Sequence, residues 1–321
     1  MSDDLERAAE VLDDAKEVAL ACHINPDGDA LGSMLGLHLI LRERGVKTVP
    51  SYSDPFVVPR RYRILPALDT LVAPAEFPLR PEVMVTFDCG SADRLGTLQP
   101  AAGGATVLIN IDHHVSNTNF GTVNLVRPDA AASAQVVHEL ARHAGWKLTR
   151  DAAFCLYLGL ATDTGRFQYR NTTPAVFDMA AELTRHDLPV DEISRVMFEE
   201  DSFSYLRLLA DVLARTELDE ERALVSAVLL QADLVAHGVG IEETDGLIDV
   251  VRRAEEADVA CVAKEQPDGS TKVSLRSTGR VDVCAIATEA GGGGHRLASG
   301  FPFAGPPAAA VTWVKERVPA R

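Results

Sequence analysis

The stretch HINPDGDALGS, residues 23–33, carries side chains that could either cap a helix or bind cations. Pro26 and Gly28 are unfavourable inside strands and helices, so the stretch predicts a turn. The turn presents four polar side chains close together: His23, Asn25, Asp27 and Asp29. Helix caps and cation sites both use carboxylate oxygens, so this stretch alone leaves the two interpretations open.

Acidic and imidazole side chains recur at the ends of other predicted elements. The segments 82–90 (EVMVTFDCG) and 105–114 (ATVLINIDHH) are typical of buried strands, and a helical pattern over AAFCLYLGLATDTG runs into a further aspartate. The side chains that end these elements are Asp88, Asp112, His113, His114 and Asp163. Ligands gather at the carboxyl ends of strands in open parallel sheets, so we expect these groups to converge on one rim.

A cluster of carboxylates and imidazoles without thiolates favours Mn²⁺, with Fe²⁺, Co²⁺ and Zn²⁺ left open. Asp27, Asp29, Asp88 and Asp163 contribute four negative charges, which two divalent cations would balance. Paired ions clamp the attacking and leaving oxygens of a phosphoryl displacement and lower the pKa of a bridging water. The chemistry indicated is phosphoester hydrolysis.

The whole chain is typical of a globular protein from a reducing compartment. Its 321 residues suffice for two domains, and its composition is 46% hydrophobic and 24% charged. The acidic start MSDDLERAAE lacks the features of a signal peptide, and the longest nearly apolar run, 152–161, is too short to span a bilayer. Five cysteines show no close pairing. We therefore expect a cytoplasmic protein without a membrane partner.

The formal net charge is −16, which argues against non-specific binding of long nucleic acid. A short anionic substrate remains compatible with this charge, because bound metal ions can reverse the local sign of a site.

The order of predicted elements indicates an α/β fold with two domains. Short β-rich runs alternate with helical patterns in the first half, including a strand over 17–24 and a helix over 31–45, so we expect a largely parallel sheet flanked by helices. This domain covers 1–188, and a charged helical linker covers 189–216. A smaller α/β domain over 217–321 contains a hairpin around PDGS, the run GGGGH, a short strand and a closing helix.

Five motifs resemble those of DHH/DHHA1 phosphoesterases and occur in the same order: HINPDGDALGS, DCG, DHH, DTGRF and GGGGHRLASG. The chain is most similar to the branch of bifunctional oligoribonucleases and PAP phosphatases, which includes actinobacterial cyclic-di-AMP phosphodiesterases. The resemblance covers essentially the whole chain, and no presumed metal position departs from the pattern.

The resemblance implies roles in the metal centre for particular residues. His23 and Asp27 would bind one ion, while a second group would bind the other: Asp29, His113 and Asp163. Asp88 would bridge the two ions. His114 would face the scissile phosphate, Asp112 would orient a histidine, and Asn25 would shape the turn or touch the substrate.

The second domain resembles a DHHA1 domain, which holds substrate in this family. Backbone N–H groups of the glycine run, including Gly293 and Gly294, can approach a phosphate closely because no Cβ intervenes. His295 would add a donor, and Arg276 would pair with a terminal phosphate. Arg166 follows the Asp163 turn closely enough to contact substrate. Two domains closing over a cleft would limit the substrate to dinucleotides and short oligonucleotides.

The substrates implied are short RNA oligomers, linear di-adenylate (pApA), cyclic di-AMP and 3′-phosphoadenosine 5′-phosphate (pAp), and the resemblance also implies a homodimer. Two alternatives stay open. An inorganic pyrophosphatase of the same superfamily would have a different C-terminal domain, and a non-catalytic nucleotide-binding protein should have lost some of the ligands.

Overall fold

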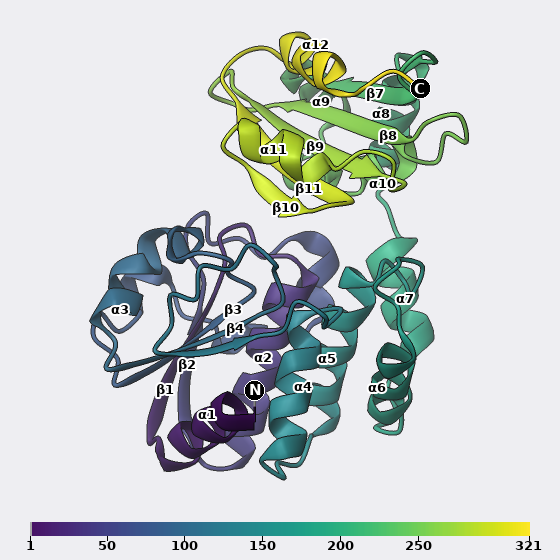
Figure 1. Cartoon of the computed structure of the whole chain (residues 1–321). Helices are drawn as coiled ribbons and strands as arrows, with labels where there is room; N and C mark the ends of the chain where they lie inside the picture. Colours follow the sequence, from purple (N-terminus) through teal and green to yellow (C-terminus); the bar gives the residue numbers. More distant parts are fainter. Residues whose placement is uncertain (1) are drawn as a thin grey trace. The chain divides into compact units, whose positions relative to one another are not determined.

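The computed structural model describes residues 2–321, and the chain divides into two compact units between Glu199 and Glu200 (Figure 1). Each unit has its own sheet and its own buried core. Over residues 2–321, no helix has both the length and the apolar composition that crossing a membrane requires.

The first unit is built on a five-stranded sheet in the order β2-β1-β3-β4-β5, in which every neighbouring pair is parallel. The strands are β1 (Glu17–Cys22), β2 (Lys47–Ser51), β3 (Val83–Phe87), β4 (Val107–Asp112) and β5 (Val123–Val126). The predicted α/β fold with a parallel sheet is therefore confirmed. All five strands run the same way, so their carboxyl ends share one edge.

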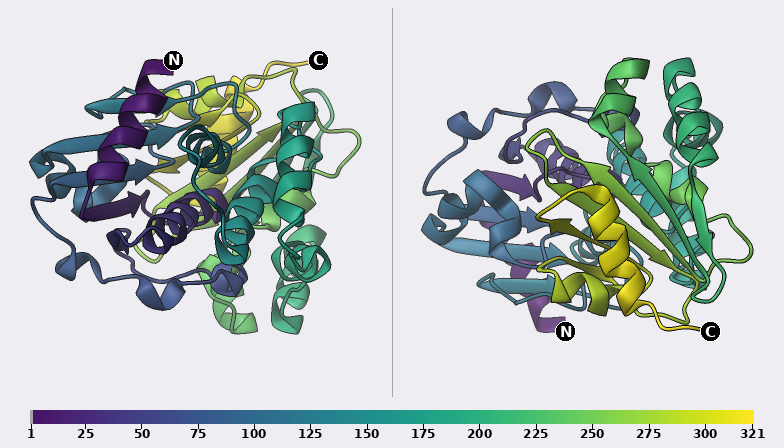
Figure 2. Two further views of the ribbon diagram at one scale, coloured as in Figure 1. Left: turned by 90° about the horizontal axis from the view of Figure 1, so that it is seen from below. Right: turned by 90° about the horizontal axis from the view of Figure 1, so that it is seen from above.

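Helices cover both faces of this sheet, as Figures 1 and 2 show. Val18 and Leu20 belong to the core formed with α1, α2 and α4, whereas Ala19 and Ala21 belong to the core formed with α3 and the 3₁₀ segment η4 (Ala92–Leu98). The helices are α1 (Ser2–Asp14), α2 (Gly28–Glu43), α3 (Gln99–Gly104), α4 (Ser133–His143), α5 (Arg150–Asp163), α6 (Pro174–Thr184) and α7 (Val190–Phe198). Burial on both faces explains why the strands are almost continuously apolar in sequence.

Three glycines on α2 let this helix pack closely against α5. Gly28, Gly32 and Gly36 are spaced four residues apart, so they lie on one face of the helix. A Cβ at Gly32 would lie 2.5 Å from the carbonyl oxygen of Cys155 on α5. Gly28 faces the end of α5 near Thr162, so the packing brings the beginning of α2 to the end of α5.

The predicted linker over 189–216 contains two helices rather than a single connecting helix. Ile193 and Met197 of α7 are buried in the core of the first unit, whereas Leu208 and Val212 of α8 (Phe203–Ala214) are buried in the second. The Ser202 side chain accepts a hydrogen bond from Tyr205 N and starts α8. The apolar face of each helix is buried in its own unit, so the helical structure is interrupted between α7 and α8.

The second unit has a six-stranded mixed sheet in the order β10-β11-β9-β8-β7-β6. Only β7 and β8 pair in parallel; the other neighbours are antiparallel. The strands are β6 (Glu217–Asp219), β7 (Leu224–Leu229), β8 (Val259–Glu265), β9 (Thr271–Ser277), β10 (Gly293–His295) and β11 (Ala298–Phe303). The remaining helices are α9 (Gln231–His237), α10 (Leu247–Val251), α11 (Val283–Glu289) and α12 (Pro307–Arg317). The structure thus has the predicted hairpin, which joins β8 and β9.

Candidate metal centre

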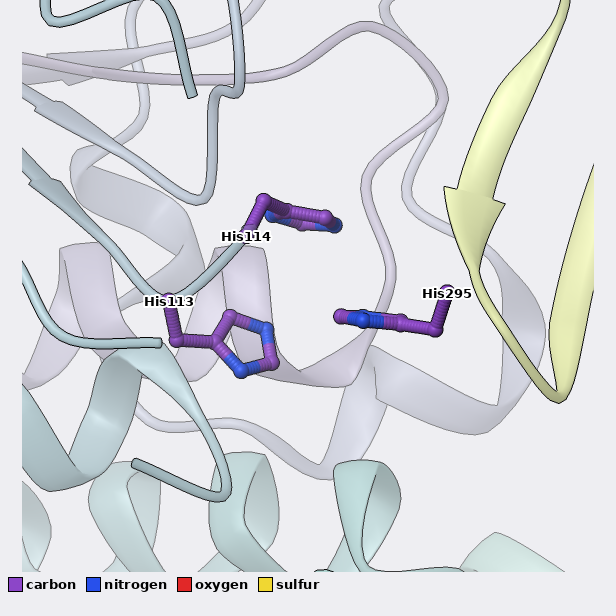
Figure 3. A group of neighbouring side chains, drawn as sticks. All are labelled: His113, His114 and His295. Atoms are coloured by element: carbon purple, nitrogen blue, oxygen red, sulfur yellow. The ribbon is translucent and has the colours of Figure 1, made fainter. Parts of the chain in front are cut away.

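The polar side chains predicted to converge follow the carboxyl ends of three neighbouring strands. His23 comes directly after β1 and Asp88 directly after β3. Asp112 is the last residue of β4, and His113 and His114 follow it in one loop (Figure 3). These segments are distant in sequence, and the parallel sheet places them on one rim.

Asp27 caps α2 with one carboxylate oxygen and has its other oxygen near His23. Its Oδ1 accepts hydrogen bonds from the backbone N–H groups of Asp29 and Ala30, both at 3.0 Å, and so caps α2. Its Oδ2 lies 3.8 Å from Nε2 of His23. This cap explains why α2 begins at Gly28, earlier than the start at residue 31 predicted from the apolar pattern.

Asp88 directs its two carboxylate oxygens at two different histidines. Oδ2 lies 3.4 Å from Nε2 of His23, and Oδ1 lies 3.4 Å from Nε2 of His113. The residue is 4% exposed, and its φ of +57° is in the left-handed region, which aspartate enters at a modest energetic cost. A single carboxylate therefore links the two sides of the centre.

The His113 side of the centre contains two more carboxylates. Nε2 of His113 is 3.2 Å from Oδ2 of Asp163 and 4.0 Å from Oδ2 of Asp29. Asp29 is fully buried, and its Oδ1 accepts hydrogen bonds from Oγ of Ser33 at 3.0 Å and from Ala134 N at 2.9 Å. The close packing of α2 on α5 is what brings these two carboxylates to one histidine.

His23 and His113 are held with Nε2 towards the carboxylates. Nδ1 of His23 is 2.8 Å from the carbonyl oxygen of Ile24, and Nδ1 of His113 is 3.3 Å from that of Ala130. A carbonyl oxygen can only accept, so each Nδ1 carries the hydrogen. The lone pair of each neutral ring is therefore on Nε2, the arrangement that suits a metal ligand.

The charges of the centre shift the pKa values of its members strongly. Burial alone would lower the pKa of His23, but Asp27 and Asp88 outweigh it and raise the value to about 10. Burial alone would raise the pKa of Asp88, but hydrogen bonds from His113 and His23 hold it well below its usual range. Burial, reinforced by neighbouring carboxylates, raises the pKa of Asp29. Protons on the histidines thus offset the carboxylates when no cation is bound.

The donor set fits divalent ions. Within the first unit, three groups have ligand atoms close enough to share an ion: His23, Asp27 and Asp88; Asp29, Asp88 and His113; and Asp88, Asp112 and His114. Ligand atoms about 2.1 Å from an ion stand roughly 3.0 Å apart in an octahedron and 3.4 Å apart in a tetrahedron. The separations of 3.2–4.0 Å found here are close to these values. Asp88 belongs to all three groups, so divalent ions fit a centre built around this carboxylate.

His114 is a third histidine near Asp88, with its Nδ1 3.5 Å from Oδ1 of that carboxylate, and a hydrogen-bonded network holds it. Its Nδ1 lies 2.8 Å from Oδ1 of Asp112, which is fully buried. Oδ2 of Asp112 accepts a hydrogen bond from Nδ2 of Asn117, which also donates to the carbonyl oxygen of Cys89 at 3.0 Å. The network holds the imidazole of His114 in one orientation.

Sequence reasoning missed two polar residues of the site, Asn117 and Ser133. Oγ of Ser133 donates to Oδ1 of Asp88 at 3.1 Å, and its backbone N–H donates to Asp29. In sequence, Ser133 has only the appearance of a helix start, and Asn117 that of a loop residue. Both contacts depend on segments far away in the chain, so local spacing gave no signal for them.

Of the two first-unit residues predicted to contact substrate, Arg166 has other neighbours and Asn25 is exposed. The Arg166 guanidinium donates to the carbonyl oxygen of Phe198 at 3.0 Å and lies 4.6 Å from the centre of its ring. Asn25 is exposed in the turn after His23, with a left-handed φ of +51°. Arg166 therefore connects the Asp163 turn to α7, while Asn25 shapes the turn and remains accessible.

Four predicted substrate-binding residues belong to the second unit. Nε of Arg276 is 3.8 Å from Oδ1 of Asp249 on α10. The glycine run was expected to precede a strand, but Gly293, Gly294 and His295 themselves form β10. Figure 3 labels His295. The reason is their close approach to β11, where a Cβ at Gly294 would lie 2.6 Å from the carbonyl oxygen of Ala298.

Comparison with known proteins gives matches for both units. A model of the N-terminal domain of the DHH family matches residues 17–160, and a model of the DHHA1 domain matches residues 222–310. The bifunctional oligoribonuclease and PAP phosphatase NrnA of Thermus thermophilus is 34% identical over 289 residues, 90% of this chain and 84% of the relative. The protein of the same name from Bacillus subtilis is 29% identical over 287 residues, 88% of each chain.

Among solved structures, an exopolyphosphatase-related protein from Bacteroides fragilis has the same fold. Its TM-score is 0.91 at 23% sequence identity, and the match covers 99% of this chain and 96% of the other.

Proposed function

We propose, because the chain belongs to the DHH family and is a hydrolase, that it cleaves phosphoester bonds of short nucleotides with two divalent ions, preferentially Mn²⁺. The resemblance of its five motifs to DHH/DHHA1 phosphoesterases is confirmed by the matches to both domains and by relatives along most of the chain.

The observation that carries the proposal is the divided orientation of the Asp88 carboxylate. One oxygen faces His23 and the other faces His113, each at 3.4 Å. In the proposed centre, His23 and Asp27 complete the ligands on one side, and Asp29, His113 and Asp163 complete those on the other. Two ions at these positions would supply Lewis acidity and a water of lowered pKa.

The remaining residues of the rim act on the phosphate. Asp112 holds Nδ1 of His114, so this imidazole is oriented to donate to a phosphate oxygen or to the leaving group. In the second unit we assign substrate binding to Arg276, Gly293, Gly294 and His295. In the first unit, the accessible Asn25 and Arg166 are assigned the same role.

The proposed substrates are RNA oligomers of a few nucleotides and pAp, which are the substrate classes in the names of the Thermus thermophilus and Bacillus subtilis relatives. The proposal extends to pApA and cyclic di-AMP, because the same phosphoester chemistry applies to both. We further propose that the protein is cytoplasmic and forms a homodimer. The elution volume of the purified protein in size-exclusion chromatography measures its oligomeric state.

The test is a panel of kcat/KM values on pAp, pApA, cyclic di-AMP, short RNA oligomers and pyrophosphate, with Mn²⁺ and then with Mg²⁺. The proposal predicts turnover of pAp and the shortest RNAs, a steep fall as the RNA lengthens, and little hydrolysis of pyrophosphate. A preference for pyrophosphate would favour the pyrophosphatase alternative. Saturable nucleotide binding without turnover would favour a binding protein.

A further inference from the structure

Ser133 contacts two different carboxylates of the candidate metal centre. It is fully buried as the first residue of α4. Its backbone N–H donates to Oδ2 of Asp29 at 2.6 Å, and its Oγ donates to Oδ1 of Asp88 at 3.1 Å. The two contacts are made by different parts of the residue, so substitution can separate them.

The contact with Asp29 does not need the serine side chain. The backbone N–H groups of Ser133 and Ala134, at the beginning of α4, donate to the two oxygens of Asp29. Any residue other than proline supplies the same N–H. The hydroxyl is therefore the part of Ser133 that acts on Asp88.

The hydroxyl bonds only one of the two Asp88 oxygens. Oδ1, which accepts from Ser133, is the oxygen that faces His113, whereas Oδ2 faces His23. A hydroxyl anchored at the start of a helix limits rotation of the carboxylate about its last side-chain bond. Oxygen Oδ1 is thereby kept on the His113 side.

We propose that Ser133 is a positioning residue, whose hydroxyl fixes Asp88 in the orientation that lets one carboxylate serve two ions. This inference rests on the proposed two-ion function. It concerns the affinity for the ion on the His113 side, because the hydrogen bond is to the oxygen of that side.

The experiment is a calorimetric titration of the metal-free full chain with Mn²⁺, in wild type and in Ser133→Ala. We expect wild type to bind two ions, and Ser133→Ala to bind one of them roughly 10- to 100-fold more weakly, since groups that orient metal ligands contribute about this much. The matched control is Ser51→Ala. Ser51 is also fully buried in the first unit, but its Oγ donates to the carbonyl oxygen of Val72 at 2.8 Å.

Thermal unfolding of the metal-free proteins separates positioning from stability. Both alanine variants should lose similar stability, while only Ser133→Ala should lose metal affinity. Ser133→Thr, which keeps the hydroxyl, should bind both ions within about threefold of wild type. Equal losses in the alanine and threonine variants would assign the effect to packing and overturn the proposal.

The outcomes also distinguish this inference from the proposed function. Two ions bound with unchanged affinity by Ser133→Ala would overturn the positioning role and leave the two-ion function intact. A wild-type chain that takes up no Mn²⁺ would overturn both.

Discussion

Two buried histidines, one before α2 and one within it, have opposite environments. His23, just before the helix, faces the carboxylates of Asp27 and Asp88, and its pKa is raised to about 10. His38, within the helix, is 1% exposed and lies between the hydroxyls of Thr48 and Thr70. Burial, aided by a nearby arginine, lowers its pKa to about 4.

The hydrogen bonds of His38 determine its protonation. The Thr70 hydroxyl donates to the carbonyl oxygen of Ala67 at 2.6 Å, so it can only accept from Nε2 of His38. Nδ1 must then accept from the hydroxyl of Thr48. Both ring nitrogens of a neutral imidazole are satisfied by the protein, whereas the His23 ring faces carboxylates that require a cation. A buried histidine therefore indicates a metal site only when it faces carboxylates, as His23 does.

The largest expected effect comes from replacing Asp88, the carboxylate that lies between His23 and His113. Asp88→Ala should reduce kcat/KM by at least about 10³-fold, because the carboxylate that both sides share is lost. Circular dichroism and thermal unfolding should show an intact fold. Asp69→Ala, which removes an exposed carboxylate beside the His38 region, is the control and should be fully active. Retained activity in Asp88→Ala would show that the assignment of the shared ligand is wrong.

Protonation of His38 should make the stability of the fold sensitive to acid. Its pKa in the folded state is about 4, below the unfolded value of 6.5, so the unfolded state takes up a proton first as the pH falls. The contribution of neutral His38 to the free energy of unfolding is fully present above about pH 6.5. It falls by up to about 3 kcal/mol as the pH approaches 4.

Urea unfolding of wild type and His38→Gln at matched pH values measures this contribution. The difference in unfolding free energy between the two proteins should shrink towards low pH, because the titrations of all other groups cancel. Parallel pH profiles would contradict a neutral, buried His38.

The close packing of α2 on α5 should be sensitive to the addition of one methyl group. Gly32→Ala should destabilise the fold by about 1–3 kcal/mol, because its Cβ would collide with the backbone of α5. Gly103→Ala is the matched control, since a Cβ at Gly103 meets no atom within 4 Å. Equal stability of the two variants, measured by urea unfolding, would mean that the contact between α2 and α5 relaxes easily.

A smaller effect should appear in the pH dependence of metal affinity. His23 must lose its proton to bind an ion, and its pKa of about 10 means that it is protonated near neutral pH when no cation is bound. Affinity should therefore rise with pH by about tenfold per unit for each proton displaced. Calorimetry in buffers of different ionisation enthalpy counts these protons, and a count of zero would argue against His23 as a ligand.

The sequence predicted the elements that carry the site better than it predicted their contacts. Apolar runs that end on Asp88 and Asp112 identified two strands of a parallel sheet, because burial on both faces leaves a strong pattern. The edge strands β2 and β5 were missed. β5 has only four residues, and β2 contains Pro50, which weakens its strand signal.

The grouping of carboxylates and histidines followed from topology, whereas their fine geometry did not. The left-handed backbone of Asp88 and the contact from Ser133 result from tertiary packing that no local spacing records. The cap that Asp27 forms was likewise not distinguished from a cation site, because caps and ligands use the same residue types.

The most direct test of the central claim is to count the ions that the chain holds and to compare activity with and without them. Dialysis against chelator followed by Mn²⁺ should load two ions per wild-type chain, and pAp hydrolysis should disappear on chelation and return with the ions. Full activity of the exhaustively chelated protein would contradict the account.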